Sequence, residues 1–391
     1  MKKSISMMLV LALALSLMLV LAACGGGAQQ PAAPAAPAAP GNVAAPEAPP
    51  EDEDGVRLIR LASHNAVVEG NSFRIRYELC IQEAADAAME HGFDVRYASF
   101  VANWDAALEV QQLQNSINEG FDFILVNPVS PTGLDPVIER AQEAGIMYIN
   151  ANNIYISPGV GVLNVGSDQF QQGYLTAMEA GRRLGAGSRV IMMAAREGNA
   201  ASELRQRGFE AGIAYHNLEV VHNSHHDWND TIGLELMLEI LNAGVQFDGI
   251  LVSQAADGLL QAYEIAGAPL PRFIGYHDSG VFMQQVISAN RDGHVMDFMV
   301  LNNSPGVGGT ALNIGLNLML GRELRADLPY WQTDIWDDVI ALLLPNSIWF
   351  TYHESWDGND LDYYYALGQR LGTDVPSHWW TFDAAAAHFF Y

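Results

Sequence analysis

Two short apolar runs separated by a helix-like segment constrain this chain more than any other feature. Residues 121–127 and 146–151 are apolar and end at polar residues, and residues 131–145 between them carry apolar side chains at helical spacing. A short apolar run bounded by turn residues is typical of a strand buried on both faces, so the pattern predicts a βαβ unit with parallel strands. The carboxyl ends of such strands lie along one edge of the sheet, where open α/β sheets bind small molecules. Asparagines stand at that edge, at Asn127, Asn150, Asn152 and Asn153.

Similar strand-like and helix-like segments alternate from residue 56 to residue 320. Alternation or short apolar runs predict strands at 56–63, 93–100, 121–127, 146–151, 162–165, 190–193, 219–222, 249–252, 273–275 and 294–301. Helical spacing predicts helices at 73–91, 104–118, 131–145, 169–184, 201–215, 230–241, 258–266, 281–289 and 306–320. Two consecutive blocks of such units predict an α/β protein with two lobes, each with a parallel sheet, and a ligand site in the cleft between them.

The first 55 residues are predicted to lie outside this fold. Lys2 and Lys3 precede an apolar run over residues 7–21, which is shorter than a typical membrane-spanning helix. Small residues follow this run and end at Cys24. This segment resembles the lipobox of bacterial lipoproteins, which implies that residues 1–23 are a signal peptide and that a lipid on Cys24 anchors the chain. A cleaved signal peptide with an incidental cysteine is the alternative. Residues 24–55 are rich in Pro and Ala and end in acidic residues, which predicts an extended linker.

Charge and cysteine content narrow the classes of function. The chain has a formal net charge of −26, with 19 Lys and Arg against 45 Asp and Glu, so it lacks the basic patches that nucleic-acid binding requires. Such a charge favours a soluble, self-repelling surface outside the cell. Cys80 is the only cysteine besides Cys24, which leaves no intrachain disulfide, and its place in a helical pattern predicts a small buried residue.

The stretch from residue 56 to residue 320 resembles the periplasmic ribose- and galactose-binding protein family, the type I solute-binding proteins of ABC sugar importers. The residues that carry the resemblance keep the family's order along the chain: Gly120-Phe121-Asp122-Phe123-Ile124-Leu125-Val126-Asn127-Pro128, Ala141 through Gly145-Ile146, Gly166-Ser167-Asp168 with Gly173, Arg205-Gln206-Arg207-Gly208-Phe209, Asp227-Trp228 and Ile274-Gly275. The resemblance implies the two-lobe periplasmic-binding-protein type I fold. It also implies three hinge crossings, near Asp168, near Asn302 and shortly after Arg322.

These crossings divide the chain into lobes. Residues 56–167 and 303–325 are assigned to the N-terminal lobe, and residues 168–302 and 326–391 to the C-terminal lobe. The resemblance fades beyond residue 328, where the chain becomes aromatic and holds six of its eight tryptophans. We expect this C-terminal extension to pack its aromatic side chains against one lobe, because an exposed apolar patch of that size favours aggregation. An extension that caps the cleft is the alternative.

The ligand site is predicted from what a sugar offers to a protein. Its hydroxyl groups pair with planar polar side chains, and its C–H faces pack on aromatic rings. The resemblance implies ten ligand-binding residues: Asn71, Phe73, Asn152, Asn153, Arg205, Trp228, Asp257, Tyr276, His277 and Asn302. Asn71 also fits a helix cap, Trp228 also fits a core position, and Asp168 is expected to cap a helix rather than to contact the ligand.

The sequence departs from the family pattern at several of these positions. Alanines at 255 and 256 stand where relatives carry an Asn-Asp pair, and Gln254 or Asp257 is expected to replace that contact. Asn152 and Asn153 replace a charged pair, and His277 replaces an aspartate. These changes remove charge from the site, so the ligand is expected to be a modified sugar or another small polar molecule rather than an ordinary pentose.

The cluster His222, His225, His226 and Asp227 contains imidazole and carboxylate groups, which are zinc ligands. Its spacing matches no common zinc pattern, and no cysteine supports it, so no metal is expected. No cofactor is expected either. The sequence contains no Gly-x-Ser-x-Gly, His-Glu-x-x-His or Gly-Lys-Ser/Thr motif, which argues against an enzyme.

The resemblance therefore implies an extracytoplasmic, lipid-anchored, monomeric solute-binding protein that captures a small polar ligand, first of all a sugar, and delivers it to an ABC permease. Two alternatives stay open. One is a receptor of the same fold that signals to a membrane kinase or chemoreceptor, and the other is a binding protein for a nucleoside or another non-sugar ligand.

Overall fold

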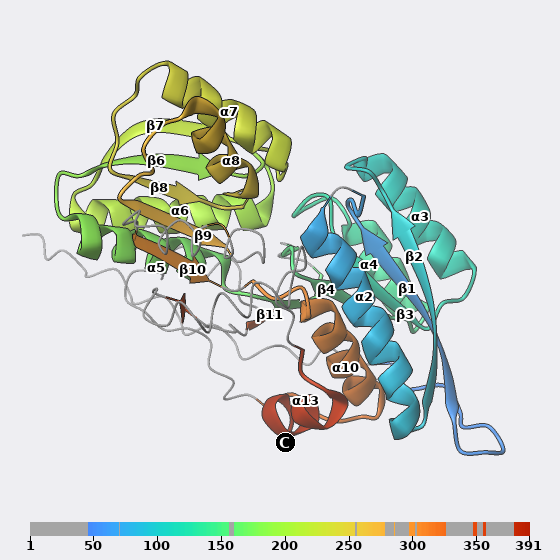
Figure 1. The fold of residues 1–391 in the computed structure, drawn as a ribbon. Coiled ribbons are helices and arrows are strands. Elements are labelled where there is room, and N and C mark those ends of the chain that lie inside the picture. Colours follow the sequence, from blue (N-terminus) through green and yellow to red (C-terminus); the bar gives the residue numbers. More distant parts are fainter. Residues whose placement is uncertain are drawn as a thin grey trace, which may run out of the picture. The chain divides into compact units, whose positions relative to one another are not determined.

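The structure is a computed structural model, and it describes residues 46–69, 71–155, 160–254, 256–277, 285, 297–301, 303–325, 347–349, 355–356 and 379–391. The five predicted strands of the first block and β11, a strand of the C-terminal extension that was not predicted, form one six-stranded sheet in the order β11-β5-β4-β3-β1-β2, in which all neighbours pair in parallel (Figure 1). These strands are β1 (Arg57–Asn65), β2 (Phe93–Val101), β3 (Phe123–Asn127), β4 (Met147–Ala151), β5 (Leu163–Gly166) and β11 (Ser347–Trp349). Every residue of β3 and β4 is buried, which confirms the strands expected from residues 121–151.

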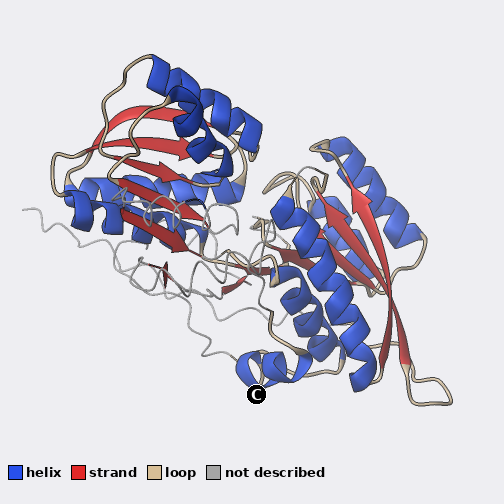
Figure 2. Cartoon of the chain, in the orientation of Figure 1, coloured by secondary structure: helices blue, strands red, loops and turns tan. Residues whose placement is uncertain are grey.

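Helices cover both faces of this first sheet (Figure 2). Alternate residues of its strands pack on α2 (Ser72–Ala87) and α10 (Val307–Met319) on one face. The other residues pack on α3 (Ala106–Asn118) and α4 (Asp135–Glu143) on the opposite face. The 3-10 helix η1 (Ala88–His91) extends α2 and leads into β2.

The second block forms another six-stranded sheet, in the order β12-β10-β9-β8-β6-β7. Its strands are β6 (Arg189–Ala194), β7 (Glu219–His225), β8 (Gly249–Val252), β9 (Phe273–His277), β10 (Asp297–Leu301) and β12 (Ser355–Trp356). β12 pairs antiparallel with β10, so this sheet is parallel except at one edge. Helices α7 (Asp230–Asn242) and α8 (Ala256–Ala266) cover one face, and α5 (Gln169–Leu184) and α6 (Ala200–His216) cover the other.

Asn and Asp residues fix where several helices begin. Asn71, Asp105, Asp168, Asn199 and Asn229 each accept a hydrogen bond from a backbone N–H in the first turn of the helix that follows. Such caps satisfy donors that the helix itself leaves unpaired. The expected capping role of Asp168 is confirmed, because its Oδ1 accepts from Gln171 N at 2.8 Å.

Two helices of the second lobe approach each other closely because glycines lie at their contact. A Cβ at Gly208 would lie 2.6 Å from the backbone nitrogen of Tyr174, and a Cβ at Gly173 would lie 2.9 Å from the carbonyl carbon of Arg205. The motif residues Gly173 and Gly208 therefore hold α6 at the distance from α5 that the site requires.

Two of the predicted crossings between the lobes are found. The chain leaves the first sheet after β5 and enters α5 beside the second sheet, and it returns between β10 and α10. The third crossing differs from the prediction. Leu324 pairs with Phe390, and β11 joins the first sheet, so these described residues stay with the first lobe beyond residue 322, and β12 is the next described segment in the second sheet.

The end of the C-terminal extension also lies elsewhere than predicted. Helix α13 (Phe382–Phe389) buries Phe382, Ala385 and Phe389 in the core that α2 and α10 share with the first sheet, not in the second lobe. Asn313 Nδ2 on α10 donates to Trp380 O at 2.8 Å, and Trp380 N donates to Thr310 Oγ1 at 3.0 Å. Polar side chains of α10 thus form hydrogen bonds with the backbone of this segment. The periodicity of residues in the extension does not indicate these contacts.

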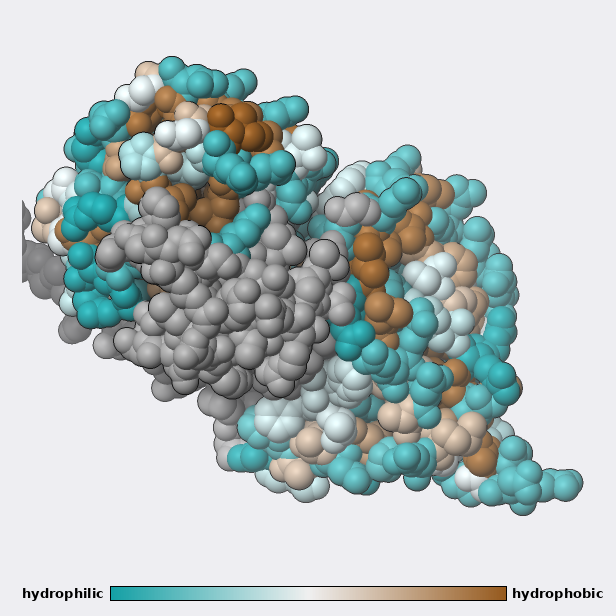
Figure 3. Space-filling view, in the orientation of Figure 1, coloured by the Kyte–Doolittle hydropathy of each residue, from teal (hydrophilic) through white to brown (hydrophobic). Residues whose placement is uncertain are grey.

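The surface of the described residues is mixed. On the face drawn in Figure 3, hydrophilic residues predominate at the edges and apolar residues form separate small groups. Cys80 is fully buried, as expected. In the part of the chain that the structure describes, no helix has the length and apolar character needed to cross a membrane. The expected signal peptide, Cys24 and the helix at 281–289 lie outside the described residues, apart from Gln285.

Candidate functional site

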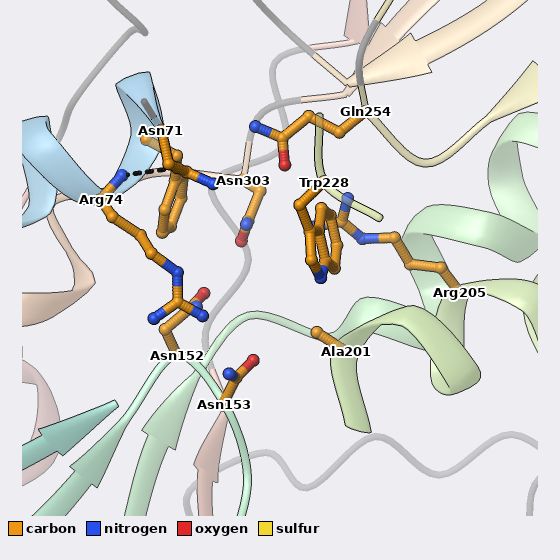
Figure 4. Close-up of a pocket in the computed structure, with 10 residues that line it drawn as sticks. Asn71, Arg74, Asn152, Asn153, Ala201, Arg205, Trp228, Gln254 and Asn303 are labelled. Atoms are coloured by element: carbon orange, nitrogen blue, oxygen red, sulfur yellow. Dashed lines mark hydrogen bonds between the residues drawn. The ribbon is translucent and has the colours of Figure 1, made fainter. Parts of the chain in front are cut away.

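A pocket collects residues that follow strand ends or begin helices in both lobes (Figure 4). The lining residues are Asn71, Phe73, Arg74, Asn152, Asn153, Ala201, Arg205, Trp228, Gln254 and Asn303. Six of the predicted site residues are therefore brought together: Asn71, Phe73, Asn152, Asn153, Arg205 and Trp228.

The first-lobe wall is built from amides that also shape the backbone. Asn71 Oδ1 accepts from Arg74 N at 2.9 Å, so Asn71 is both the helix cap and a lining residue. Asn153 Nδ2 donates to Pro128 O at 3.0 Å, which ties the loop after β4 to the loop after β3. Asn152 has φ +71°, a conformation that Asn tolerates better than most residues. Its Oδ1 is buried and has no hydrogen-bond partner in the described structure, which leaves an acceptor for a ligand.

Arg205 and Trp228 form the second-lobe wall. Arg205 is 3% exposed, and its Nε donates to Gln169 Oε1 at 2.7 Å and its Nη1 to Ser253 O at 2.5 Å. The guanidinium carbon lies 5.4 Å from the centre of the Trp228 ring, a cation–π arrangement that orients both side chains (Figure 4). Trp228 Nε1 is buried without a partner in the described structure, so it is a second group left for a ligand.

Arg74 is a lining residue that the sequence did not predict. It is 4% exposed, and its Nη1 donates to Asn65 Oδ1. Asn65 is held in turn by Glu78, whose Oε1 accepts from Asn65 Nδ2 at 3.0 Å. Burial lowers the pKa of Arg74 to about 10, which still leaves it charged at neutral pH. An arginine in the first turn of a helix looks like a solvated residue in the sequence, so no pattern indicated this position.

Two buried carboxyl groups lie behind Arg74. Glu78 accepts hydrogen bonds from Ser63, Asn65 and Tyr97, and Glu109 Oε1 accepts from Val129 N at 3.0 Å. Burial raises the pKa of Glu78, and it raises the pKa of Glu109 to about 7. Glu109 is therefore only partly ionised at neutral pH.

Contacts between the lobes flank the pocket. Gln169 Nε2 donates to Asn303 Oδ1 at 3.2 Å. The ring of Trp104, from the first lobe, lies 5.0 Å from the guanidinium carbon of Arg74 and 4.7 Å from that of Arg196 in the second lobe. Arg196 also pairs with Asp227 at 2.7 Å. The two loops that carry Trp104 and Trp228 are alike, since both tryptophans and the residues before them have φ between +51° and +62°.

The remaining predicted site residues are not placed in the pocket. Asn302 lies outside the described residues, and the side chains of Asp257, Tyr276 and His277 are not described although their backbones lie in α8 and β9. Gln254, named as a substitute for the missing Asn-Asp contact, lines the pocket. Asn303, one residue from the predicted Asn302, lines it as well.

The histidine cluster is divided by the fold. β7 extends to residue 225, three residues beyond the predicted strand, so His225 belongs to the strand together with His222. His226 is completely buried, and burial lowers its pKa to about 3, which keeps it neutral. Among the described residues, no group of three or more His, Cys, Asp or Glu side chains is arranged to hold a metal ion.

The chain is similar in sequence to known proteins. The family profile described as a periplasmic binding protein domain matches residues 68–323. A putative rhizopine-binding protein of Rhizobium meliloti is 27% identical over 231 residues, 56% of this chain and 73% of that protein. The ribose import binding protein of Escherichia coli is 24% identical over 44% of this chain, and the aligned part spans 58% of the relative's length.

Solved structures show the same fold at low identity. An ABC transporter solute-binding protein from Bacillus halodurans with bound myo-inositol has a TM-score of 0.64 at 20% identity, covering 81% of this chain and 99% of that one. The binding protein of the arabinose ABC transporter from Shewanella, bound to L-arabinofuranose, has a TM-score of 0.64 at 19% identity, covering 79% and 96%. With two helix-flanked sheets, chain crossings after β5 and between β10 and α10, and a family profile that matches most of its fold, the chain belongs to the periplasmic binding protein family.

Proposed function

We propose that this chain is an extracytoplasmic receptor that binds a sugar or a closely related polyol in the pocket and delivers it to an ABC permease. The observation that carries the proposal is the lining of the pocket, which joins amides and arginines from both lobes with Phe73 and Trp228. Planar polar groups pair with hydroxyls, and aromatic rings pack on the C–H faces of a sugar ring. Relatives named for rhizopine, ribose and xylitol support this class of ligand.

Ligand binding would work by stabilising one arrangement of the lobes. Asn152 Oδ1 in the first lobe and Trp228 Nε1 in the second are buried without described partners, so a ligand that contacts both repays their lost hydration. Only a ligand with better affinity for the closed arrangement shifts the population toward it. The permease then recognises that arrangement. Members of this family are binding proteins, and we assign no catalytic role to any residue.

The test is a thermal-shift screen of the purified protein against pentoses, hexoses, inositols, pentitols and nucleosides. A ligand at about 100 times its dissociation constant adds about 2.7 kcal/mol to the free energy of unfolding, which raises the melting temperature by several degrees. A shift with a sugar or polyol is expected. A shift with nucleosides alone would overturn the sugar assignment, and a receptor for signalling rather than transport would bind the sugar but fail to stimulate ATP hydrolysis by the permease.

We further propose that the lipid on Cys24 anchors the receptor to the membrane through a linker over residues 24–55. The small residues before Cys24 and the Pro-Ala composition after it support this. The wild-type chain is expected in the membrane fraction of expressing cells and the C24A variant in the soluble fraction. Equal partition of the wild-type chain and the C24A variant between the two fractions would refute the lipid anchor.

A further inference from the structure

The charge of the pocket differs from the charge of the whole chain. Among the ten described residues that line it, two are arginines, five are amides and none is an aspartate or glutamate. The protein as a whole carries a net charge of −26, so composition alone would favour cationic ligands. The pocket therefore concentrates positive charge in an acidic protein.

Arg74 is the lining group that most directly defines what a ligand must offer. Within the described residues its guanidinium donates only to Asn65, although it carries five N–H donors in a planar fork. Asn65 is fixed by Glu78, and the Trp104 ring lies 5.0 Å from the guanidinium carbon. Figure 4 shows the side chain extended along the first-lobe wall toward Asn152. The guanidinium is therefore buried, oriented and equipped with further donors.

Other groups in the pocket also favour a ligand that accepts hydrogen bonds. Asn71 Oδ1 is used by the helix cap, so its NH₂ group is the part left for a ligand, and the buried Nε1 of Trp228 can only donate. The N-termini of α2 and α6 also meet at the pocket, since Phe73 and Ala201 of their first turns line it. Each such terminus carries a partial positive charge.

Two carboxyl groups behind the wall favour the charged form of Arg74, but neither accepts a hydrogen bond from its guanidinium in the described structure. Glu78 and Glu109 are both buried, and burial raises the pKa of each, that of Glu109 to about 7. The N–H groups of the guanidinium that no described residue accepts are available to a ligand carboxylate. A carboxylate accepts two parallel N–H bonds from a guanidinium and carries the opposite charge, whereas a hydroxyl group in its place offers one uncharged oxygen.

We propose that the ligand is an acidic sugar derivative, a small polyhydroxy carboxylate such as a uronate or an aldonate, whose carboxylate binds Arg74 at the N-terminus of α2. Asn152 Oδ1 accepts from one of its hydroxyl groups, and Trp228 packs on its C–H face. This inference rests on the proposed sugar-binding function and narrows its ligand class.

The experiment compares acids with their neutral counterparts by calorimetric titration of the purified protein at pH 7.5. The pairs are D-glucuronate with D-glucose, D-galacturonate with D-galactose, and D-gluconate with sorbitol. In at least one pair the acid is expected to bind at least tenfold more tightly than the neutral member. R74Q is expected to reduce this ratio to below threefold, while R74K retains part of it. R207Q, an exposed arginine on α6 that does not line the pocket, is the matched control and leaves the ratio unchanged.

The comparison within the wild-type protein keeps the inference falsifiable if R74Q does not fold. Neutral members that bind as tightly as the acids, or more tightly, would overturn the inference and leave the sugar-binding function standing. Failure of both members of every pair would count against the sugar-binding function itself, and the inference would fall with it.

Discussion

Among the described residues, each lobe contains one fully buried histidine, and this pair makes a specific prediction about stability in acid. His64 and His226 are 1% and 0% exposed. His64 Nε2 lies 3.0 Å from Ser116 Oγ, and neither ring nitrogen of His226 has a partner in the described structure. Burial lowers the pKa of each to about 3, so both are neutral in the folded protein and become charged only when it unfolds or at very low pH.

The size of the effect follows from the difference between the folded and unfolded pKa values. A group whose pKa is lowered by folding contributes stability above its unfolded pKa, about 6.5 for histidine, and loses it as the pH falls further. Each pH unit below 6.5 costs about 1.4 kcal/mol, so each histidine lowers the free energy of unfolding by about 2 kcal/mol at pH 5.

Buried carboxyl groups act in the opposite direction and would hide the effect in the wild-type protein. Burial raises the pKa of Asp168 to about 6 and that of Glu109 to about 7. A raised carboxyl pKa contributes stability at low pH that is lost as the pH rises through the folded pKa. Between pH 7.5 and pH 5 the two kinds of group therefore largely cancel, and only a comparison of variants isolates the histidines.

The assay is urea denaturation of the wild type, H64L, H226L and the double variant at pH 7.5 and pH 5. Any packing cost of the substitution is the same at both pH values and drops out of the difference. Each single variant is expected to lose about 2 kcal/mol less than the wild type on acidification, and the double variant about 4 kcal/mol less, because distant sites add. Identical losses in all four proteins would refute the argument that these histidines are buried and neutral.

Three further predictions concern the site and its support. W228A is expected to weaken ligand binding by at least about 2 kcal/mol in calorimetry, as for other buried aromatic anchors, whereas an unchanged affinity would remove Trp228 from the site. G208A places a Cβ against the carbonyl oxygen of Phe170 and is expected to lower the free energy of unfolding by about 1–3 kcal/mol, while R207A, exposed on the same helix, changes it by less than about 0.5. F389A removes a ring that is 1% exposed in the first-lobe core and is expected to cost about 3–5 kcal/mol, and a neutral result would contradict the packing of α13 there.

Sequence periodicity was sufficient for the described strands and helices between residues 57 and 319, because their apolar faces are buried within each lobe. The βαβ unit at residues 121–151 appears as β3, α4 and β4 within a few residues of the predicted bounds. The extension after residue 328 was harder, since its aromatic residues show no period that indicates which lobe they contact. Its last helix depends on Asn313 and Thr310 of α10, and such long-range pairs leave no local signal.

The residues that line the pocket could also be predicted from the sequence only in part. Polar residues at strand ends, such as Asn152, could be predicted because a parallel sheet places them at one edge. Arg74 could not, because its burial depends on Asn65, Glu78 and Trp104, which approach it only in the folded protein. The amino-acid pattern predicts where a site lies more readily than which charges it presents.

The central claim is that one ligand is held by both lobes at once. Hydrogen–deuterium exchange, measured with and without the tightest ligand of the sugar and sugar-acid series, tests it most directly. The account predicts that backbone amides of residues 71–77 and of residues 202–209 are protected together when the ligand is added. Protection confined to one of these segments, or found only away from the pocket, would contradict it.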